Sequence, residues 1–213
     1  MKLHNFFRSG TSHRLRIALN LKGLDYDYVA VHLGKEEHLS AAFKALNPQG
    51  LVPALVVNND LVLTQTPAII EWLEERYPTP ALLPARPEDR ARVRALAALV
   101  GCDIHPLNNR RVLEYLRKQL GCDDTAVNAW CATWITAGFE ALEALLVADT
   151  QRGDFCFGNT PTLADVYLVP QVESARRFKV DLAPFPTIAA IDLACGALAA
   201  FQKAAPSRQP DAA

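Results

Sequence analysis

Three hydroxyl side chains, those of Ser9, Thr11 and Ser12, lie between a short apolar stretch and a basic, helix-like stretch in the segment FFRSGTSHRLRIAL. At such a point the first backbone N–H groups of the helix have no acceptor within it, and the helix dipole adds positive potential. The residues therefore predict an anion-binding site. No cysteine lies in this segment. If the bound anion is a reactive thiolate, a small molecule has to supply it.

The composition limits the classes of partner. The chain has 213 residues, with 22 Lys and Arg against 23 Asp and Glu, so no general attraction to nucleic acid or to an anionic membrane is expected. The five cysteines are scattered without a CxxC pair, and the histidines show no ligand spacing, so no disulfide framework and no metal site are predicted. We see neither a signal peptide nor a membrane span and expect a cytoplasmic protein.

The first 78 residues alternate between strand and helix patterns. Strands are predicted at 2–6, 26–33, 54–57 and 61–64, and helices at 12–22, 36–46 and 67–77, with a short Asn-Asn-Asp turn at 58–60. The order is βαβ, then α, then ββα. It predicts an α/β domain with a mixed four-stranded sheet and helices packed on it.

The rest of the chain has a different pattern. The proline-rich stretch 79–87 is predicted to be a linker. Apolar residues then recur at helical spacing in 90–100, 109–120, 127–147, 163–178 and 187–204, which predicts an all-helical domain over 88–213. The polar tail PSRQPDAA is expected to be loosely held.

Several motifs resemble those of one family. The segment FFRSGTSHRLRIAL is similar to the signature of zeta-class glutathione transferases, whose members include glutathione-dependent maleylacetoacetate and maleylpyruvate isomerases. NPQGLVPAL resembles the family's cis-proline loop, TQTPAIIEWLEE its γ-glutamyl motif, and GNTPTLAD its helix-capping box of Thr162 and Asp165. The resemblance runs from Phe6 to about Pro210 and implies a thioredoxin-like domain followed by a helical-bundle domain, glutathione as cofactor, and a homodimer.

The resemblance also assigns the glutathione site. Ser9 is our first candidate to donate a hydrogen bond to the glutathione thiolate, assisted by Gly10 and Thr11. The alternative is that Ser9 and Thr11 only cap the following helix. The candidate contacts with the rest of the tripeptide are His38, Gln49, Val52, Pro53, Gln65, Thr66 and, across a dimer interface, Asp103.

Arginines are the residues expected to bind a small dicarboxylate, because a guanidinium pairs with a carboxylate through two parallel hydrogen bonds. Arg8 lies in the signature segment itself. The resemblance implies that two helical segments face the substrate, and these add the candidates His105, Asn108, Asn109, Arg110, Arg176 and Arg177. Helix phase places Arg176 on the inward stripe, four residues after Val172, whereas the family's motif register favours Arg177, so both are kept. Two further arginines, Arg14 and Arg16, are expected to face solvent or to brace the domain interface.

One departure bears on the mechanism. The zeta signature reads serine, serine, cysteine after the arginine, where this chain has Ser9, Gly10 and Thr11, so the family's cysteine is absent. The resemblance then implies isomerisation of maleylpyruvate, in which a glutathione thiolate adds to the double bond, the bond rotates, and the thiolate leaves. The alternatives are maleylacetoacetate isomerisation, a conjugating transferase, and a non-catalytic binding module of the same fold.

Overall fold

The computed structural model describes residues 1–58 and 61–212, which form two compact units. One consists of Met1–Ala81 together with Ala197–Ala213, and the other of Leu82–Gly196. The sequence prediction assigned 1–78 to one domain and 88–213 to the other. The structure differs by placing the last segment of the chain in the first unit, for reasons given below.

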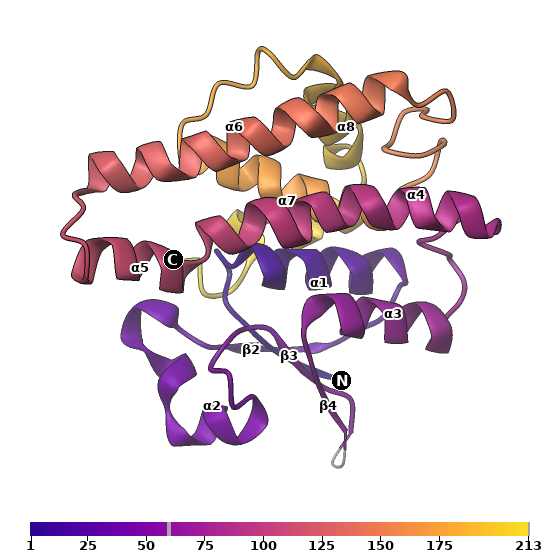
Figure 1. Cartoon of the computed structure of the whole chain (residues 1–213). Coiled ribbons are helices and arrows are strands. Elements are labelled where there is room, and N and C mark those ends of the chain that lie inside the picture. The colour runs from indigo at the N-terminus through magenta and orange to yellow at the C-terminus, as the bar shows by residue number, and fades with distance from the viewer. Residues whose placement is uncertain (59–60, 213) are drawn as a thin grey trace. The chain divides into compact units, whose positions relative to one another are not determined.

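The first unit contains the predicted mixed sheet. Its strands are β1 (Lys2–Asn5), β2 (Asp27–Ala30), β3 (Ala54–Val56) and β4 (Val62–Thr64), in the order β2-β1-β3-β4. Strand β1 is parallel to β2 and antiparallel to β3, which is antiparallel to β4. Helices α1 and α3 cover one face of the sheet and α2 the other (Figure 1). In the predicted turn at 58–60, Asn59 and Asp60 lie outside the described residues.

Helix α1 spans Gly10–Leu21 and starts two residues before the predicted 12–22, because Ser9 provides its N-cap. Helix α3 spans Thr66–Arg76 with proline in its first turn, as expected. The predicted helix at 36–46 is wrong in its first half. That part forms the 3-10 turn Glu37–Leu39, which follows another 3-10 turn at Leu33–Lys35, and only Ala41–Leu46 is the helix α2. Glu36 is left-handed, with φ 57°, which interrupts any helix there.

The second unit is helical, as predicted, apart from one isolated bridge between Arg152 and Gly158. Its elements are α4 (Pro87–Ala98), a π-helical turn (Leu99–Ile104), a 3-10 turn (His105–Asn108), α5 (Arg110–Lys118), α6 (Asp124–Ala148), α7 (Leu163–Arg177) and α8 (Pro186–Gly196).

The predicted capping box is present at the start of α7. The buried Asp165 carboxylate accepts hydrogen bonds from the backbone N–H of Thr162 at 2.7 Å and of Cys156 at 2.8 Å. The box therefore fixes the approach to α7 as well as its first turn.

One helix of the second unit meets a criterion for membrane spans. Among the described residues, α6 is the one helix long and apolar enough to cross a bilayer by length and composition, a test that core helices of water-soluble proteins also pass. Val127, Ile135, Phe139 and Leu142 on this helix are buried within the unit. The predicted absence of a membrane span therefore stays a prediction.

The predicted helix at 187–204 is two helices. Leu198 is extended, with φ −88° and ψ 133°, and separates α8 from α9 (Ala199–Ala204). The amide of Asn20 on α1 donates to the carbonyl of Ala200 at 2.9 Å, so α9 belongs to the first unit. The tail, predicted to be loose, forms a 3-10 turn (Pro206–Arg208) and makes side-chain hydrogen bonds as far as Asp211.

The first unit also extends a little beyond the predicted boundary at residue 78. The ammonium of Lys22 donates to the carbonyls of Tyr77 and Pro80, at 2.8 and 2.7 Å, and pairs with Glu74 at 2.7 Å. These contacts hold the first part of the proline-rich stretch to α1. Helix α4 begins at Pro87, inside the predicted linker.

Candidate functional site

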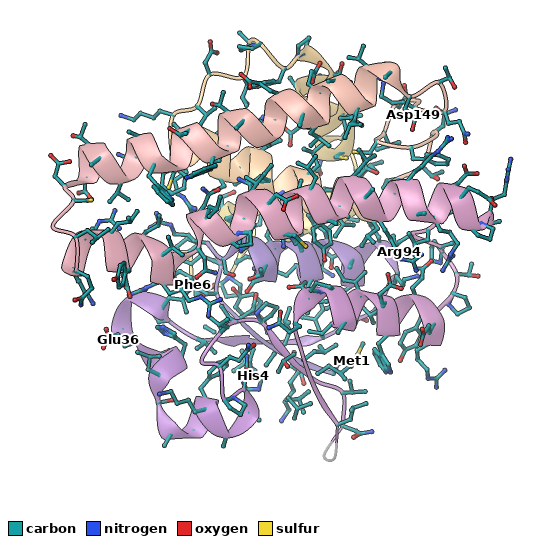
Figure 2. The ribbon with its side chains drawn as sticks, viewed as in Figure 1. Met1, His4, Phe6, Glu36, Arg94 and Asp149 are labelled. Atoms are coloured by element: carbon teal, nitrogen blue, oxygen red, sulfur yellow. The ribbon has the colours of Figure 1, made fainter. Side chains whose placement is uncertain are left out.

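The turn between β1 and α1 has the geometry of an anion-binding helix start. Ser9 is extended, with φ −70° and ψ 121°, and its hydroxyl oxygen accepts from the backbone N–H of Ser12 at 3.2 Å. The backbone N–H of Ser9 donates to the carbonyl of Phe6 at 3.1 Å, which closes the turn. Phe6, which directly follows β1, is labelled in Figure 2. No acidic residue lies in the first turn of α1, so nothing there opposes a bound anion.

Two hydroxyl groups connect this turn to the cis-proline loop. The oxygens of Ser9 and Thr11 are 2.9 Å apart, and the Thr11 hydroxyl donates to the backbone carbonyl of Val52 at 2.9 Å. A threonine hydroxyl has one hydrogen, so the hydrogen between the two hydroxyls comes from Ser9. Ser9 can therefore reach a thiolate by rotating its hydroxyl, while Thr11 keeps its bond to Val52.

The loop that contains Val52 is fixed from within. The Asn47 amide donates to the carbonyl of Leu51 at 2.7 Å, and its oxygen accepts from the backbone N–H of Gln49 at 3.1 Å. The cis peptide bond expected between Val52 and Pro53 is present. Gly50 has φ +63°, a conformation that favours glycine, and a Cβ there would lie 3.1 Å from the carbonyl oxygen of His38. The candidate His38 is therefore adjacent to this loop.

The start of α3 provides the third part of the site. Gln65 precedes the helix with φ 65°, and its amide donates to the side-chain oxygen of Gln49 at 2.6 Å. Thr66 is the buried first residue, so its backbone N–H has no acceptor within the helix. The structure thus brings together two candidates, Gln49 and Gln65, that are sixteen residues apart.

These groups fit the chemistry of glutathione. A thiolate is matched by the hydroxyl and N–H donors at the start of α1, and a carboxylate by the N–H groups at the start of α3. The backbone N–H of Val52 donates to no protein acceptor within residues 1–58 and 61–212, so it can bind the peptide group of a ligand. Ser9, Thr11, Val52, Gln65 and Thr66 would hold the tripeptide through these donors.

Sequence reasoning did not single out His13, which lies on α1 four residues after Ser9. The side chain is buried, and burial, together with the guanidinium groups of Arg16 and Arg14, lowers the pKa of His13 to about 3. The imidazole is therefore neutral at physiological pH, and His13 adds no positive charge beside the turn. The helical pattern of the sequence does not indicate that His13 is buried, because this burial depends on tertiary packing.

We expect His13 to make the folded state sensitive to acid. Its folded pKa lies below the ordinary value of 6.5, so the unfolded chain binds this proton more readily. The free energy of unfolding should therefore fall by up to about 1.4 kcal/mol per pH unit from this group as the pH drops from 6.5 towards 3. Urea denaturation of the wild type and of His13→Gln over this range should show a shallower decline in the variant. An identical decline would contradict a buried neutral His13.

Arg8, which precedes Ser9, is exposed, and its guanidinium lies 6.0 Å from the centre of the Phe7 ring. In the second unit, Arg110 pairs with Glu114 at 2.6 Å, one turn further along α5. Arg110 therefore already has a carboxylate partner on its own helix.

The two neighbouring arginines of α7 differ in their partners. Arg176 is exposed instead of lying on the inward stripe, and it binds the carboxylate of Asp192 on α8 at 2.5 Å. The helix-phase expectation is wrong because the buried stripe continues from Val172 to Ala175, three residues on. Arg177 donates to the hydroxyl of Ser174 at 3.2 Å and lies over the ring of Phe178 at 4.8 Å.

The other candidates of the second unit have different environments. Asn109 is the N-cap of α5 and accepts from the backbone N–H of Arg111 at 3.2 Å, which gives it a structural role. Asn108 is buried, and its oxygen accepts from the amide of Gln171 at 3.3 Å, a partner that sequence reasoning did not find. His105 is half-buried at the start of a 3-10 turn, and Asp103 is exposed in the π-helical turn.

Models of known protein families match both the N-terminal and the C-terminal half of the chain. Residues 8–76 match the profile of the glutathione S-transferase N-terminal domain, and residues 110–206 match that of its C-terminal domain. The chain is also 72% identical, over the full length of both sequences, to the maleylpyruvate isomerase of a Ralstonia species. The chain belongs to the glutathione S-transferase family.

Solved structures show which class of glutathione transferase the chain resembles. It matches a holo structure of a bacterial maleylpyruvate isomerase of the zeta class with a TM-score of 0.98 and 72% identity, covering 100% of each chain. It matches the maleylacetoacetate isomerase of Anaeromyxobacter dehalogenans with a TM-score of 0.89 and 45% identity, covering 100% of this chain and 93% of the other. That structure has dicarboxyethyl glutathione and citrate bound in its active site. The resemblance to the zeta class and the predicted fold are confirmed.

Proposed function

We propose that this glutathione transferase is a glutathione-dependent cis-trans isomerase that converts maleylpyruvate to fumarylpyruvate. The observation that supports it most is the site at the start of α1, which offers donors for a thiolate but no protein thiol. When bound, glutathione supplies the thiolate that adds to the cis double bond, permits rotation about it, and is eliminated unchanged. The isomerase relatives support the same chemistry.

In this proposal Ser9 keeps the sulfur ionised. Its hydroxyl already accepts from the backbone N–H of Ser12, which polarises the O–H bond towards a bound anion. The helix dipole acts in the same direction. Thr11 holds the cis-proline loop against the turn through its bond to Val52, so the donors remain aligned when Ser9 rotates.

Arginines bind the two carboxylates and offset the negative charge that develops on the substrate carbonyl during addition. We assign this role to Arg8 in the first unit and, because the family's motif register favours it, to Arg177 in the second. Arg176 pairs with the carboxylate of Asp192 and Arg110 with that of Glu114, so a substrate carboxylate would have to compete with the one already bound. We further propose that the protein is a cytoplasmic homodimer, that its N-terminal domain binds glutathione, and that its helical domain binds the substrate.

The nearest alternative is maleylacetoacetate isomerisation, which is the same chemistry on a longer acid. The chain is 72% identical to the Ralstonia maleylpyruvate isomerase and 52% identical to the maleylacetoacetate isomerase of Pseudomonas aeruginosa, a difference that favours maleylpyruvate. A conjugating transferase or a binding module would not need several arginines for a dicarboxylate.

The choice of substrate can be measured directly. We expect kcat/KM with glutathione to be higher for maleylpyruvate than for maleylacetoacetate, and activity towards a chloronitrobenzene to be negligible by comparison. A higher kcat/KM for maleylacetoacetate would reassign the substrate. Efficient conjugation without isomerisation would contradict the proposed reaction.

A further inference from the structure

The C-terminal segment of the chain makes side-chain contacts with the strand-to-helix turn that carries Ser9. The segment comprises α9, the 3-10 turn Pro206–Arg208 and the residues up to Asp211. Its own path is fixed by Gln209, whose amide donates to the carbonyls of Lys203 and Ala205, both at 2.8 Å. Asp211 is therefore held in a defined position near the end of the chain.

Arg16 joins this segment to the turn. The side chain is fully buried, and its Nε donates to the carbonyl of Ala204 at 3.0 Å. Its two terminal nitrogens donate to the Asn5 side chain at 2.9 Å and to the carbonyl of Phe7 at 3.0 Å. Burial lowers the pKa of Arg16 to about 10, so the group is still a cation at neutral pH. Contrary to the sequence expectation, Arg16 does not face solvent, and its hydrogen-bond partners all lie within the first unit.

Asp211 binds the same residue, Phe7, on its N–H side. One oxygen of its carboxylate accepts from the backbone N–H of Phe7 at 3.2 Å, and the other accepts a short hydrogen bond from the hydroxyl of Tyr28. Burial, then this hydrogen bond, raises the pKa of Tyr28, so the phenol remains a donor. Phe7 is thus bound at its N–H by Asp211 and at its C=O by Arg16.

Phe7 lies two residues before Ser9, and the preceding residue, Phe6, accepts the N–H of Ser9. The position of the Ser9 hydroxyl therefore depends on the segment that Arg16 and Asp211 hold. Because the sulfur has to lie within hydrogen-bond distance of that hydroxyl, a small displacement of the turn weakens the stabilisation of the thiolate.

We propose that Asp211 is a positioning residue of the active site and that the C-terminal segment sets the geometry of the turn that ionises glutathione. Asp211 acts through Phe7 and does not touch glutathione or the substrate. The inference rests on the proposed function, because it presumes that Ser9 stabilises the thiolate. A segment that only completed the fold would contribute to stability and leave the ionisation of glutathione unchanged.

The variants Asp211→Asn and Tyr28→Phe test this inference in the full-length protein. Asparagine keeps the size of the side chain but replaces one acceptor oxygen by a donor, and phenylalanine removes the hydroxyl that orients the carboxylate. Asp25→Asn, at an exposed carboxylate of the same unit, is the matched control. The pKa of the glutathione thiol in the binary complex is measured from thiolate absorbance, alongside kcat, the KM for glutathione and the unfolding midpoint.

We expect Asp211→Asn to raise the pKa of the bound thiol and to lower kcat roughly tenfold at saturating glutathione. Tyr28→Phe should also raise the pKa of the bound thiol and lower kcat, but by smaller amounts. Asp25→Asn should change neither quantity. A lower unfolding midpoint with an unchanged thiol pKa and kcat would overturn the inference and leave the proposed function intact. A wild-type protein that does not lower the thiol pKa would contradict the proposed function and this inference with it.

Discussion

Replacing Ser9 by alanine is expected to lower kcat for isomerisation by roughly 10²- to 10³-fold, the usual effect of removing one aligned donor from a developing or bound anion. The hydroxyl lies at the start of α1, where its hydrogen can turn from Thr11 to the sulfur. Its loss leaves the thiolate with backbone donors and the helix dipole only. The pKa of the bound thiol should therefore move towards that of free glutathione, and the pH dependence of kcat should shift to higher pH with it.

The Ser9 hydroxyl also caps α1, so the two roles have to be separated. Ser9→Gly removes the hydroxyl but costs only a few tenths of a kcal/mol as a cap. Ser40→Ala is the matched control, because Ser40 caps α2 by accepting from the N–H of Phe43 at 3.2 Å, the same distance as in the Ser9 cap. Activity lost in Ser9→Gly and kept in Ser40→Ala supports the thiolate role. Near wild-type activity in Ser9→Gly would show that Ser9 is only a cap.

Arg177→Ala is expected to lower kcat/KM by roughly 10- to 100-fold, the effect of losing hydrogen bonds between a guanidinium and a carboxylate. Arg176→Ala should lower it by less than about threefold, because the Asp192 carboxylate already occupies that guanidinium and the pair is partly exposed. Steady-state kinetics with varied maleylpyruvate at saturating glutathione compares the two.

The variant Arg177→Lys separates the effect of the charge from the effect of the paired donors. It keeps the charge but loses the planar pair of donors, so it should recover only part of the lost activity. If Arg176→Ala proves the more damaging of the two alanine variants, with its unfolding midpoint unchanged, the assignment to Arg177 is wrong.

Local sequence signals were sufficient for much of the first unit. The order of strands and helices followed from periodicity, and the cap at Ser9 and the first-turn Pro67 followed from residue preferences. The resemblance added the cis bond at Pro53, which the structure contains. The roles of the site residues stay proposals, although the geometry brings Ser9, Thr11 and Val52 into one hydrogen-bonded group.

The errors lie where tertiary contacts override local pattern. Residues 187–204 have a continuous helical pattern, but the chain turns at Leu198 so that α9 can accept hydrogen bonds from Asn20 and Arg16 on α1. Arg16 is fully buried because four oxygens converge on its guanidinium, and no local spacing indicates that. The tail was predicted to be loose because it is polar. Its contact with Phe7 joins residues 204 positions apart, so no local pattern could indicate it.

Isomerisation with glutathione at a small fraction of the substrate concentration tests the central claim most directly. The claim is that the reacting sulfur belongs to glutathione and is returned at every turnover. We predict that all the cis substrate is converted to the trans product and that the glutathione is recovered as free thiol. Conversion that stops after one equivalent, with the glutathione held as a stable adduct, would contradict it, and so would full conversion without glutathione.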